Sequence, residues 1–553
     1  MIKINCCLAM SIAVLSFSGC AVFNYGASFN KQAETTQVQA TSQTSFVVRQ
    51  QREAKNCVDG MIRDPKRNKN VLVLLALSGG GSRAAYFSAL SMREMQNIGL
   101  KIGDFESDVL DEVDVISSVS GGSLAGAYYA VSHDPGTECA GYASHPWTDT
   151  KIRELMTLDY RWRWLGRWFW PNNIAAYWFT KYDRTDIMAK VMADNLFDKK
   201  ITGFDLTLGE LNPLRPNLIL NATTGSDDKP MGIGFGEVFT FTTEDFARIC
   251  SSIEDYSVAR AVMATATFPG VFNLMTLRNY CQKDMADDTE DQRYLHVFDG
   301  GNADNLGLTS LKRVIWTSLK DRETQPSLPY KNVIVVLVDA FTDSRGVDPK
   351  KSDPRGAFDF IMDMNFIDAT TCLLEANRER LLAGFDQEQL NLFPFAMGSD
   401  GKINKRCKDF FHSDKDAEKY CRKPPEYWRA LNNAIGEKFL FVHLSFDKVG
   451  DVEGCTGNNP SDLGCLRRQL NRIPTDFRLR QFYRHEGTEL TDAEAIACAV
   501  PSLFGRNDQP CGKLSPKPSP ELSRKWDRVK QILQEPAVEN LSNADLPNHR
   551  PQN

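Results

Sequence analysis

Residues Val71–Leu90 read VLVLLALSGGGSRAAYFSAL, an apolar run followed by three glycines and then by a helix-like pattern. Such an apolar run is typical of a strand that is buried on both faces of a mostly parallel sheet. The same order of strand, glycine turn and helix recurs at Val113–Tyr129, and further buried strands are expected at Asn217–Asn221 and Asn332–Asp339. Strands that alternate with helical patterns predict an α/β fold with helices on both faces of the sheet.

The 553-residue chain exceeds the usual size of one compact domain. We expect a core over 65–345 with an insertion at about 133–216, a continuation of the same domain over 346–512, and a peripheral tail over 513–553. The continuation contains one clear strand, Lys438–Phe446, and the tail contains a helix that opens at Ser519. A net charge of −6 provides no basic surface for nucleic-acid phosphates, so nucleic-acid binding is disfavoured.

The N-terminus has the order of a secretory signal, with Lys3, an apolar run to Phe17 and small residues before Cys20. Residues 17–20 resemble the lipobox of bacterial lipoproteins. This resemblance implies that the signal peptide, 1–19, is removed and that Cys20 carries lipid, whereas the alternative is ordinary secretion. Residues 20–60 are rich in Gln, Thr, Ser and Ala, which predicts a flexible tether. The expected location is the bacterial envelope, with a lipid anchor in the outer membrane facing the periplasm.

The predicted insertion holds an aromatic segment, RWRWLGRWFWPNNIAAYWF, at 161–179. Its tryptophans are Trp162, Trp164, Trp168, Trp170 and Trp178, and they alternate with Arg161, Arg163 and Arg167. Aromatic rings beside arginines suit a bilayer interface, where rings lie among headgroups and arginines meet lipid phosphates. The alternative is that these rings form the core of a lid or subdomain.

Close cysteine pairs occur in the C-terminal half. They are Cys407 with Cys421, Cys455 with Cys465, and Cys498 with Cys511. In an oxidising compartment such pairs can close short loops, although sequence does not fix their connectivity. None has the CxxC spacing of a zinc or redox site, so a metal role is disfavoured.

Ser120 is the candidate nucleophile. A serine hydroxyl attacks only when a base takes its proton and nearby donors stabilise the oxyanion. A sharp turn from strand to helix exposes that hydroxyl and requires small residues two positions away on each side. Gly122 meets this requirement, and Ser118 replaces the first glycine of the GxSxG pattern.

The three consecutive glycines Gly79, Gly80 and Gly81 form the candidate oxyanion site. Their backbone N–H groups can point into one concavity, and Arg83 can add positive charge or hold the loop. A phosphate-binding P-loop would need a lysine where the chain has Ser82-Arg83, so that alternative fails. A dinucleotide-binding turn fits the glycine spacing but lacks a second strand before an acidic residue, so it is disfavoured.

Asp299 lies between an apolar strand end and two glycines, where another loop can approach it. A carboxylate within hydrogen-bond reach of Ser120 can act as the base if burial tunes its proton affinity. Two alternatives remain open at this point. Asp299 can simply cap the turn, or a histidine can be the base. The histidines after Asp299 lack a strand-end setting, with His443 inside a strand and His412 and His485 in polar stretches.

The ordered motifs GGGSR at Gly79–Arg83, SVSGG at Ser118–Gly122 and DGG at Asp299–Gly301 together resemble the patatin-like phospholipase family. The segment Val258–Phe272 also resembles that family, while Ile473–Leu479 is a plausible C-terminal continuation. The resemblance implies a three-layer α/β/α sandwich with a mostly parallel central sheet, here with an aromatic-rich insertion and a C-terminal extension.

The resemblance further implies a Ser-Asp dyad that hydrolyses acyl esters of phospholipids or related lipids without metal or cofactor. Carried over by position, Ser120 is the nucleophile and Asp299 the base. The backbone of Gly79, Gly80 and Gly81 supplies the oxyanion hole, supported by Arg83. Membrane lipids are then the substrate partners. The alternatives are a catalytically silent, membrane-tethered lipid-binding protein and an esterase or lysophospholipase that acts on single-chain substrates.

Overall fold

The computed structural model describes most of the chain. The described residues are 25–34, 44–47, 67–135, 145–198, 205–226, 233–281, 294–324, 326–342, 365–386, 390–395, 404–411, 414–450, 466–471, 473–479, 490–506 and 511–535. The predicted signal peptide, Cys20 and the pair Cys455 and Cys465 lie outside these ranges. Within them, no helix combines the length and the apolar composition needed to cross a bilayer.

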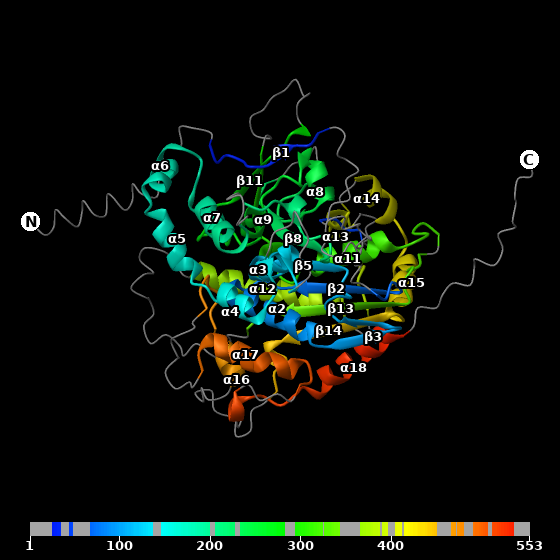
Figure 1. Ribbon diagram of the computed structural model, residues 1–553. Helices are drawn as coiled ribbons and strands as arrows, with labels where there is room; N and C mark the ends of the chain where they lie inside the picture. Colours follow the sequence, from blue (N-terminus) through cyan, green and yellow to red (C-terminus); the bar gives the residue numbers. More distant parts are fainter. Residues whose placement is uncertain are drawn as a thin grey trace, which may run out of the picture.

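Parallel strands form the centre of the main sheet (Figure 1). In spatial order they are β8 (Asn217–Thr224), β5 (Val115–Val119), β2 (Val71–Leu77), β13 (Asn332–Asp339) and β14 (Phe439–Ser445). Each strand that the apolar runs predict is present, so the mostly parallel α/β fold is confirmed. Three antiparallel strands complete the sheet around β8. Strand β9 (Val238–Phe241) and strand β12 (Tyr294–Asp299) both pair with β8, and β11 (Met275–Arg278) pairs with β12.

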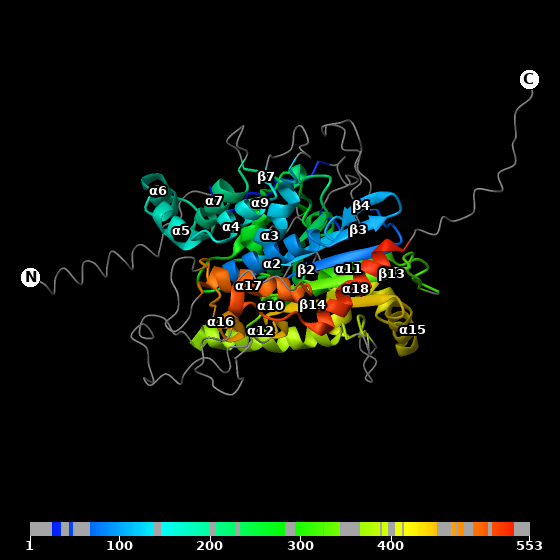
Figure 2. The same cartoon turned by 60° about the horizontal axis from the view of Figure 1, so that its bottom comes forward.

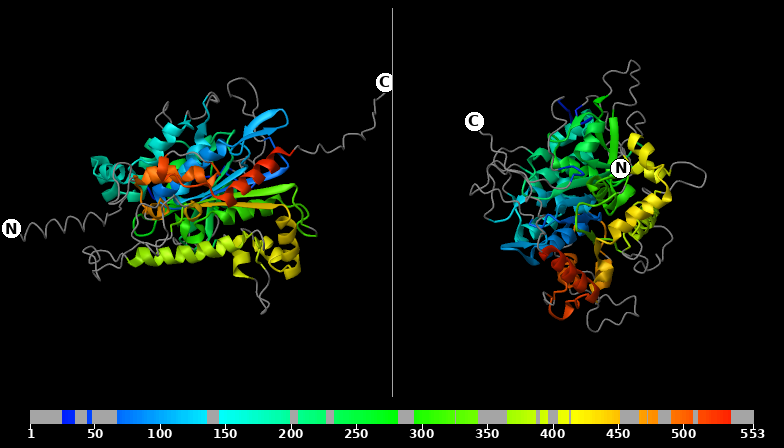
Figure 3. Two further views of the ribbon diagram at one scale, coloured as in Figure 1. Left: turned by 90° about the horizontal axis from the view of Figure 1, so that it is seen from below. Right: turned by 90° about the vertical axis from the view of Figure 1, so that its right-hand side faces the viewer.

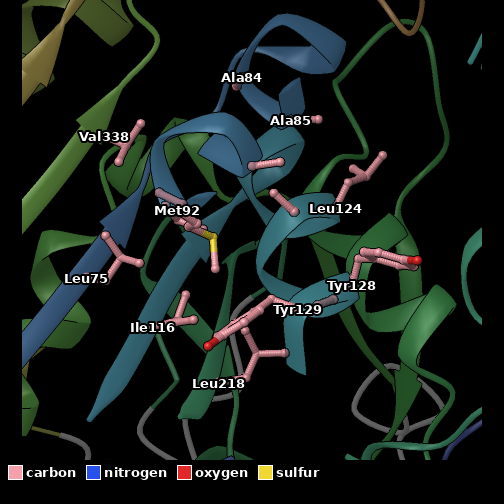
Figure 4. Packing of buried hydrophobic residues seen from close by; sticks show 14 of the residues in the cluster. Leu75, Ala84, Ala85, Met92, Ile116, Leu124, Tyr128, Tyr129, Leu218 and Val338 are labelled. Atoms are coloured by element: carbon pink, nitrogen blue, oxygen red, sulfur yellow. The ribbon is translucent and has the colours of Figure 1, made fainter. Parts of the chain in front are cut away.

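The sheet separates two hydrophobic clusters, one on each face. Strand β2 is buried on both faces because it contributes side chains to both clusters. Alternate side chains point to opposite faces, so Leu75 joins one cluster and Leu74 the other. The helices over the Leu75 face are α2 (Gly81–Gln96), α3 (Ser120–Val131), α4 (Asp149–Met156), α7 (Arg184–Leu196), α9 (Val258–Thr265) and α16 (Leu466–Asn471). Figure 4 shows Met92 of α2 packed above Leu75 and Ile116 on this face.

Another set of helices covers the Leu74 face. They are α11 (Leu308–Ser318), α12 (Asn365–Ala383), α13 (Lys405–Phe410), α14 (Asp414–Tyr420) and α15 (Pro425–Gly436). Figures 2 and 3 show α2 and α12 on opposite sides of the sheet. The chain therefore has the predicted layers of helix, sheet and helix.

The C-terminal tail is less peripheral than the sequence suggests. Just before the tail, helix α17 (Asp492–Leu503) begins with a capping box, in which the Glu494 amide donates to Thr491 Oγ1 and the Thr491 amide donates to Glu494 Oε2. Helix α18 (Pro520–Gln534) buries Leu522 and Trp526 in the Leu75-face cluster. The prediction of a peripheral tail is wrong for this helix, because its apolar face completes that cluster.

Two segments of the predicted tether are docked on the domain. Strand β1 (Lys31–Gln32) pairs with β10 (Ser251–Ser252), and the buried Asn30 side chain donates to Arg278 O. Residues 44–47 bring Phe46 into the Leu74-face cluster. The prediction of a flexible tether is therefore wrong for residues 25–34 and 44–47. The first segment pairs with β10, and the second packs against the apolar cluster.

The aromatic segment forms two helices, α5 (Tyr160–Trp168) and α6 (Pro171–Phe179), at one end of the molecule in Figures 1 and 2. Its rings divide into two sets. Trp164 and Trp168 pack against each other with ring centroids 5.1 Å apart, and Trp164 also meets Phe272. In contrast, Trp162 and Trp170 are exposed. The packing interpretation therefore holds for Trp164 and Trp168, whereas the bilayer interpretation stays a prediction for the exposed Trp162 and Trp170.

Disulfides join Cys407 to Cys421 and Cys498 to Cys511, as the spacing suggests. A third disulfide, between Cys250 and Cys281, joins residues 31 positions apart that sequence did not pair. It links the end of α8 (Thr243–Arg248) to the residues after β11. Cross-links of this kind restrict the unfolded chain and so stabilise the folded domain.

Candidate active site

Ser120 lies at the turn from β5 into α3. Its φ is 47°, in the left-handed region that residues other than glycine rarely adopt. A strained backbone of this kind persists only where the surrounding structure holds it, and it is the geometry of a nucleophile elbow. Because Ser120 is the first residue of α3, the partial positive charge of the helix N-terminus lies beside it.

The two glycines after Ser120 allow the elbow to contact the glycine loop, which we define as Ser78–Ser82. A Cβ at Gly121 would lie 2.0 Å from the carbonyl oxygen of Gly81. A Cβ at Gly122 would lie 2.6 Å from the carbonyl oxygens of Leu77 and Ser78. Glycine is therefore required at both positions, because any side chain would push the elbow away from the loop.

Ser118 fits where the GxSxG pattern has its first glycine. Its side chain is fully buried, and its hydroxyl donates to the carbonyl oxygen of Ile219 at 3.4 Å. Gly126 of α3 leaves space above it, because a Cβ at that glycine would stand 3.4 Å from Ser118 Oγ. The departure from the pattern is thus accommodated, and the elbow forms with serine at this position.

The ladder of β8 explains how Asp299 reaches Ser120. Strand β9 pairs with residues 220–223 of β8, while β5 pairs with 217–221 and β12 with 222–224. Since a strand residue has one neighbour on each side, β5 and β12 must share the side of β8 that β9 leaves free. Strand β12 therefore arrives from the opposite direction, directly beyond the end of β5 at Val119.

This end-to-end arrangement brings the two predicted dyad residues together. Ser120 Oγ donates a hydrogen bond to Asp299 Oδ2 at 3.1 Å. The other carboxylate oxygen, Asp299 Oδ1, accepts from the Gly301 amide at 2.8 Å, and the Thr223 hydroxyl donates to the Asp299 carbonyl at 2.8 Å. The carboxylate is thus fixed by its own turn and by β8 as it faces the serine.

Histidine does not take the base position in the part of the chain that the structure describes. Neither Ser120 nor Asp299 hydrogen bonds to a histidine there. His443 instead pairs with Asp339, and His296 contacts the Thr276 hydroxyl. His412 and His485 lie outside the described residues.

Burial raises the pKa of Asp299 to about 6. The side chain is only 6% exposed, and the loss of hydration disfavours its charged form. The hydrogen bonds from Gly301 and Ser120 act in the opposite direction but are weaker. A carboxylate with this pKa is a stronger base than an ordinary aspartate and is still mostly ionised at neutral pH.

The glycine loop presents backbone donors beside the elbow. Gly80 has φ 140° and Gly81 has φ 62°, conformations that side chains rarely permit. The Gly79 amide donates to the Asn305 carbonyl at 2.9 Å and so is already occupied. The amides of Gly80 and Gly81 have no acceptor among the described residues. Two of the three predicted donors are therefore available for an oxyanion.

Arg83 ties the glycine loop to neighbouring segments, and it makes no hydrogen bond to Ser120 among the described residues. Its guanidinium donates to the Ile473 carbonyl and to the hydroxyls of Thr342 and Thr475. Burial lowers its pKa to about 10, and Asp339 acts against that shift. The Ser82 amide also donates to the Asp476 carbonyl at 2.8 Å. The segment 473–479 therefore covers the loop, as a structural support for it.

Three supporting residues escape prediction from sequence. Asn305 accepts from the Gly79 amide, Thr223 supports the Asp299 turn, and Asp476 supports the Ser82 amide. Asp476 lies in the segment Ile473–Leu479 that the resemblance singled out as a C-terminal continuation, but nothing in that segment indicates its contact with Ser82. Asn305 lies four residues after the last glycine of the DGG motif, and that proximity could have identified it. The described residues contain no group of three or more His, Cys, Asp or Glu arranged to hold a metal ion.

Comparison with known proteins gives one family match and a set of similar solved structures. Residues 75–312 match the model of the family described as patatin-like phospholipase. Among solved structures, the chain is similar to VipD from Legionella pneumophila, at 12% identity over 56% of each chain and with a TM-score of 0.21. A likeness this weak carries no argument about the fold or its function. No curated protein sequence matches the chain.

Proposed function

We propose that the patatin-like phospholipase domain formed by residues 75–312 hydrolyses acyl esters of phospholipids with Ser120 as nucleophile and Asp299 as base. The observation that carries the proposal is the 3.1 Å hydrogen bond from Ser120 Oγ to a buried carboxylate. The donors of Gly80 and Gly81 beside the elbow support it, because an acyl transfer needs an oxyanion site as well as a base.

In the first half of the reaction, Ser120 Oγ attacks the carbonyl carbon of the ester and its proton passes to Asp299 Oδ2. The negative charge that forms on the carbonyl oxygen is met by the amides of Gly80 and Gly81. Collapse of this intermediate breaks the bond to the alcohol part of the lipid, which takes the proton from Asp299 and leaves. The products of this half are the deacylated lipid and an acyl ester on Ser120.

In the second half, Asp299 takes a proton from a water molecule, which attacks the acyl ester. The same two amides stabilise the second oxyanion. The fatty acid then leaves, and Ser120 Oγ regains its proton from Asp299. One carboxylate thus acts alternately as base and acid, and the enzyme returns to its starting state.

Fatty-acid release from mixed phospholipid vesicles tests this function. Wild-type protein should release fatty acid, and Ser120→Ala should not. Release only from single-chain lysophospholipids or soluble esters would support the narrower esterase alternative. Lipid binding by folded wild-type protein without any release would favour the silent lipid-binding protein instead.

The pH dependence follows from Asp299. Its active form is the carboxylate, so kcat/KM should fall about tenfold per pH unit below the pKa of about 6 and level off above it. An ordinary aspartate would place this fall near pH 4. The measurement is a pH-rate profile between pH 4 and 8 on a short-chain soluble ester. A profile that is flat down to pH 5 would contradict the assignment of Asp299 as base.

We also propose that α5 and α6 bind the membrane surface. Trp162 and Trp170 are each 63% exposed, and Phe169 is 74% exposed. Residues 160–181 carry Arg161, Arg163, Arg167 and Lys181 and contain no acidic residue, although the whole chain is acidic. Arg161 and Arg167 are ion-paired with Asp476 and Asp194, whereas Arg163 and Lys181 have no ion pair among the described residues. Exposed aromatic rings with such cations on the same short segment suit an interface with anionic headgroups. Trp164 and Trp168 support this surface from beneath.

These helices contact the support of the glycine loop. Arg161 of α5 forms an ion pair with Asp476 at 3.2 Å, and the Tyr160 amide donates to the Phe477 carbonyl at 3.1 Å. Phe272 joins the two elements, because its ring meets both Trp164 and Phe477. The proposed membrane surface therefore contacts the segment 473–479, which in turn contacts the glycine loop that carries the oxyanion donors.

Replacing both Trp162 and Trp170 with Ser should weaken binding to anionic vesicles by at least about tenfold, because two large rings no longer enter the interface. Turnover of a soluble short-chain ester should stay unchanged. Vesicle flotation measures the first and a colorimetric assay the second. The matched control is Phe105→Ser, an exposed ring on β4 (Phe105–Asp108) at the other end of the molecule (Figure 2). Equal losses in both variants would contradict a specific surface.

We further propose that Cys20 carries a lipid anchor in the outer membrane. The lipobox-like residues 17–20 support this proposal, and a membrane location fits a substrate that is itself a membrane lipid. Mass spectrometry of the mature N-terminus tests it, since a diacylglycerol-modified Cys20 is expected. An unmodified, soluble mature protein in the envelope would refute the anchor.

A further inference from the structure

A cavity of about 300 Å³ lies on the Leu74 face of the sheet, among β9, α11, α12 and α13. Its wall contains cations from three helices, Lys312 and Arg313 of α11, Arg380 of α12 and Arg406 of α13. We call this cavity the cationic pocket. Only two acidic residues, Glu237 and Asp409, share its lining. The pocket belongs neither to the dyad nor to the α5–α6 surface.

Lys312 forms the buried part of the pocket. Its side chain is 9% exposed, and it has no ion-pair partner among the described residues. The acidic residue that acts on the pKa of Lys312 is Asp304. Its carboxylate already accepts from the amides of Leu306, Gly307 and Thr309. A buried ammonium group without a counter-ion is costly, so an anion that entered the pocket would gain a strong partner.

The other cations complete an anion site. Arg313 is fixed by donating to the carbonyls of Phe410 and Asp409, so its position is set before any ligand arrives. Arg380 and Arg406 lie at the exposed side, and neither has an acidic partner within the described ranges. The two guanidinium groups repel each other. The pKa of Arg380 is lowered first by burial and second by this repulsion from Arg406. An anion between them would remove the repulsion.

The two acids do not neutralise this cluster. Burial raises the pKa of Glu237 and of Asp409, which favours their uncharged forms relative to exposed carboxylates. Even when both are ionised, four cations face two anions. Burial also lowers the pKa of Lys312 to about 8, so its ammonium group is still mostly protonated at pH 7. The pocket therefore carries a net positive charge at neutral pH.

We propose that the cationic pocket binds a phosphoryl group. Arginine guanidinium groups pair with phosphate oxygens through two parallel hydrogen bonds, and a lysine at the base supplies a point charge. The volume lies at the lower end of the range for small-molecule sites, which suits one phosphomonoester rather than a lipid with its chains. The phosphoryl group can come from an anionic lipid headgroup at the membrane or from a free phosphate compound.

Binding is tested on full-length Ser120→Ala protein, so that lipid turnover does not interfere and the outcome is independent of the proposed catalysis. Isothermal titration calorimetry with inorganic phosphate and with glycerol 3-phosphate tests the free source. Flotation with phosphatidylcholine vesicles, with and without phosphatidic acid, tests the headgroup source. Binding in either arm supports the site, and the arm in which it occurs identifies the source.

Paired variants connect this binding to the pocket. Arg406→Gln should weaken binding about tenfold, because it removes one bidentate partner from an exposed position without disturbing the fold. Lys312→Met should weaken it further. The matched control is Lys405→Gln, an exposed cation on the same helix that does not line the pocket. Binding in neither arm, or equal weakening by Lys405→Gln and Arg406→Gln, would overturn the proposal.

Discussion

Asp299→Asn is expected to lower kcat for ester hydrolysis by about a thousandfold or more. The asparagine oxygen can still accept from the Gly301 amide, but the group that faces Ser120 Oγ can no longer take a proton. General base catalysis alone typically contributes a hundredfold to ten-thousandfold. Ser120→Ala should lose at least as much, because it removes the nucleophile itself. Initial rates on a soluble ester measure both effects.

Stability distinguishes lost chemistry from lost folding. The pKa of Asp299 is raised from 3.8 to about 6 in the folded protein, so its ionised form is disfavoured by folding. The protonated carboxyl of Asp299 therefore contributes to the free energy of unfolding. This contribution is fully present below pH 3.8 and is lost as the pH rises through 6. At pH 8 the asparagine variant should therefore be more stable than wild type by about 2 to 3 kcal/mol, with no gain near pH 3.5.

The matched control for the serine variant is Ser123→Ala. Ser123 lies on the same helix, and its buried hydroxyl has no hydrogen-bond partner among the described residues. Its removal should leave activity close to wild type. Near-wild-type turnover by a folded Asp299→Asn variant would contradict the dyad, as would inactivity of Ser123→Ala equal to that of Ser120→Ala.

Gly121→Ala should produce the second large effect. The new Cβ would stand 2.0 Å from the Gly81 carbonyl oxygen and 2.8 Å from the Gly81 nitrogen, so the backbone of the elbow or the loop must move. Overpacking of this kind costs about 1 to 3 kcal/mol. The displacement also separates the oxyanion donors from Ser120, so kcat should fall at least about a hundredfold. Urea unfolding and initial rates measure the two parts.

Gly126→Ala is the control, because it makes the same change five residues further along α3. Its Cβ would meet neighbours no closer than 3.4 Å, which is ordinary contact. Alanine also favours a helix over glycine by about 1 kcal/mol. This variant should fold and turn over normally. Equal damage from both substitutions would mean that the contact between elbow and loop is not what requires glycine at 121.

The sheet was predictable because its strands are buried on both faces. Strand β13 has the bounds that its apolar run predicts, Asn332–Asp339, and β8 begins at the expected Asn217. The proximity of Ser120 and Asp299 was predictable for a similar local reason. A serine between small residues and an aspartate before two glycines each specify a turn, and both turns lie at strand ends.

The remaining features depend on contacts that sequence does not encode locally. No pattern at Asp476 indicates that its carbonyl accepts from Ser82, because the two meet only after the chain has folded. Lys31 and Gln32 lie in a polar segment and form a strand only because β10 offers an edge. Periodicity likewise could not divide the tryptophans, since Trp164 packs on Phe272 through a tertiary contact, while no ring in the described part of the chain packs on Trp162.

Fluorophosphonate labelling followed by peptide mass spectrometry tests the central claim most directly. The reagent forms a covalent bond only with a serine that a base activates beside oxyanion donors. The account predicts one modified peptide, with the adduct on Ser120, and no adduct in folded Ser120→Ala or Asp299→Asn protein. An adduct on a different serine, or unchanged labelling of Ser120 in the Asp299→Asn variant, would contradict it.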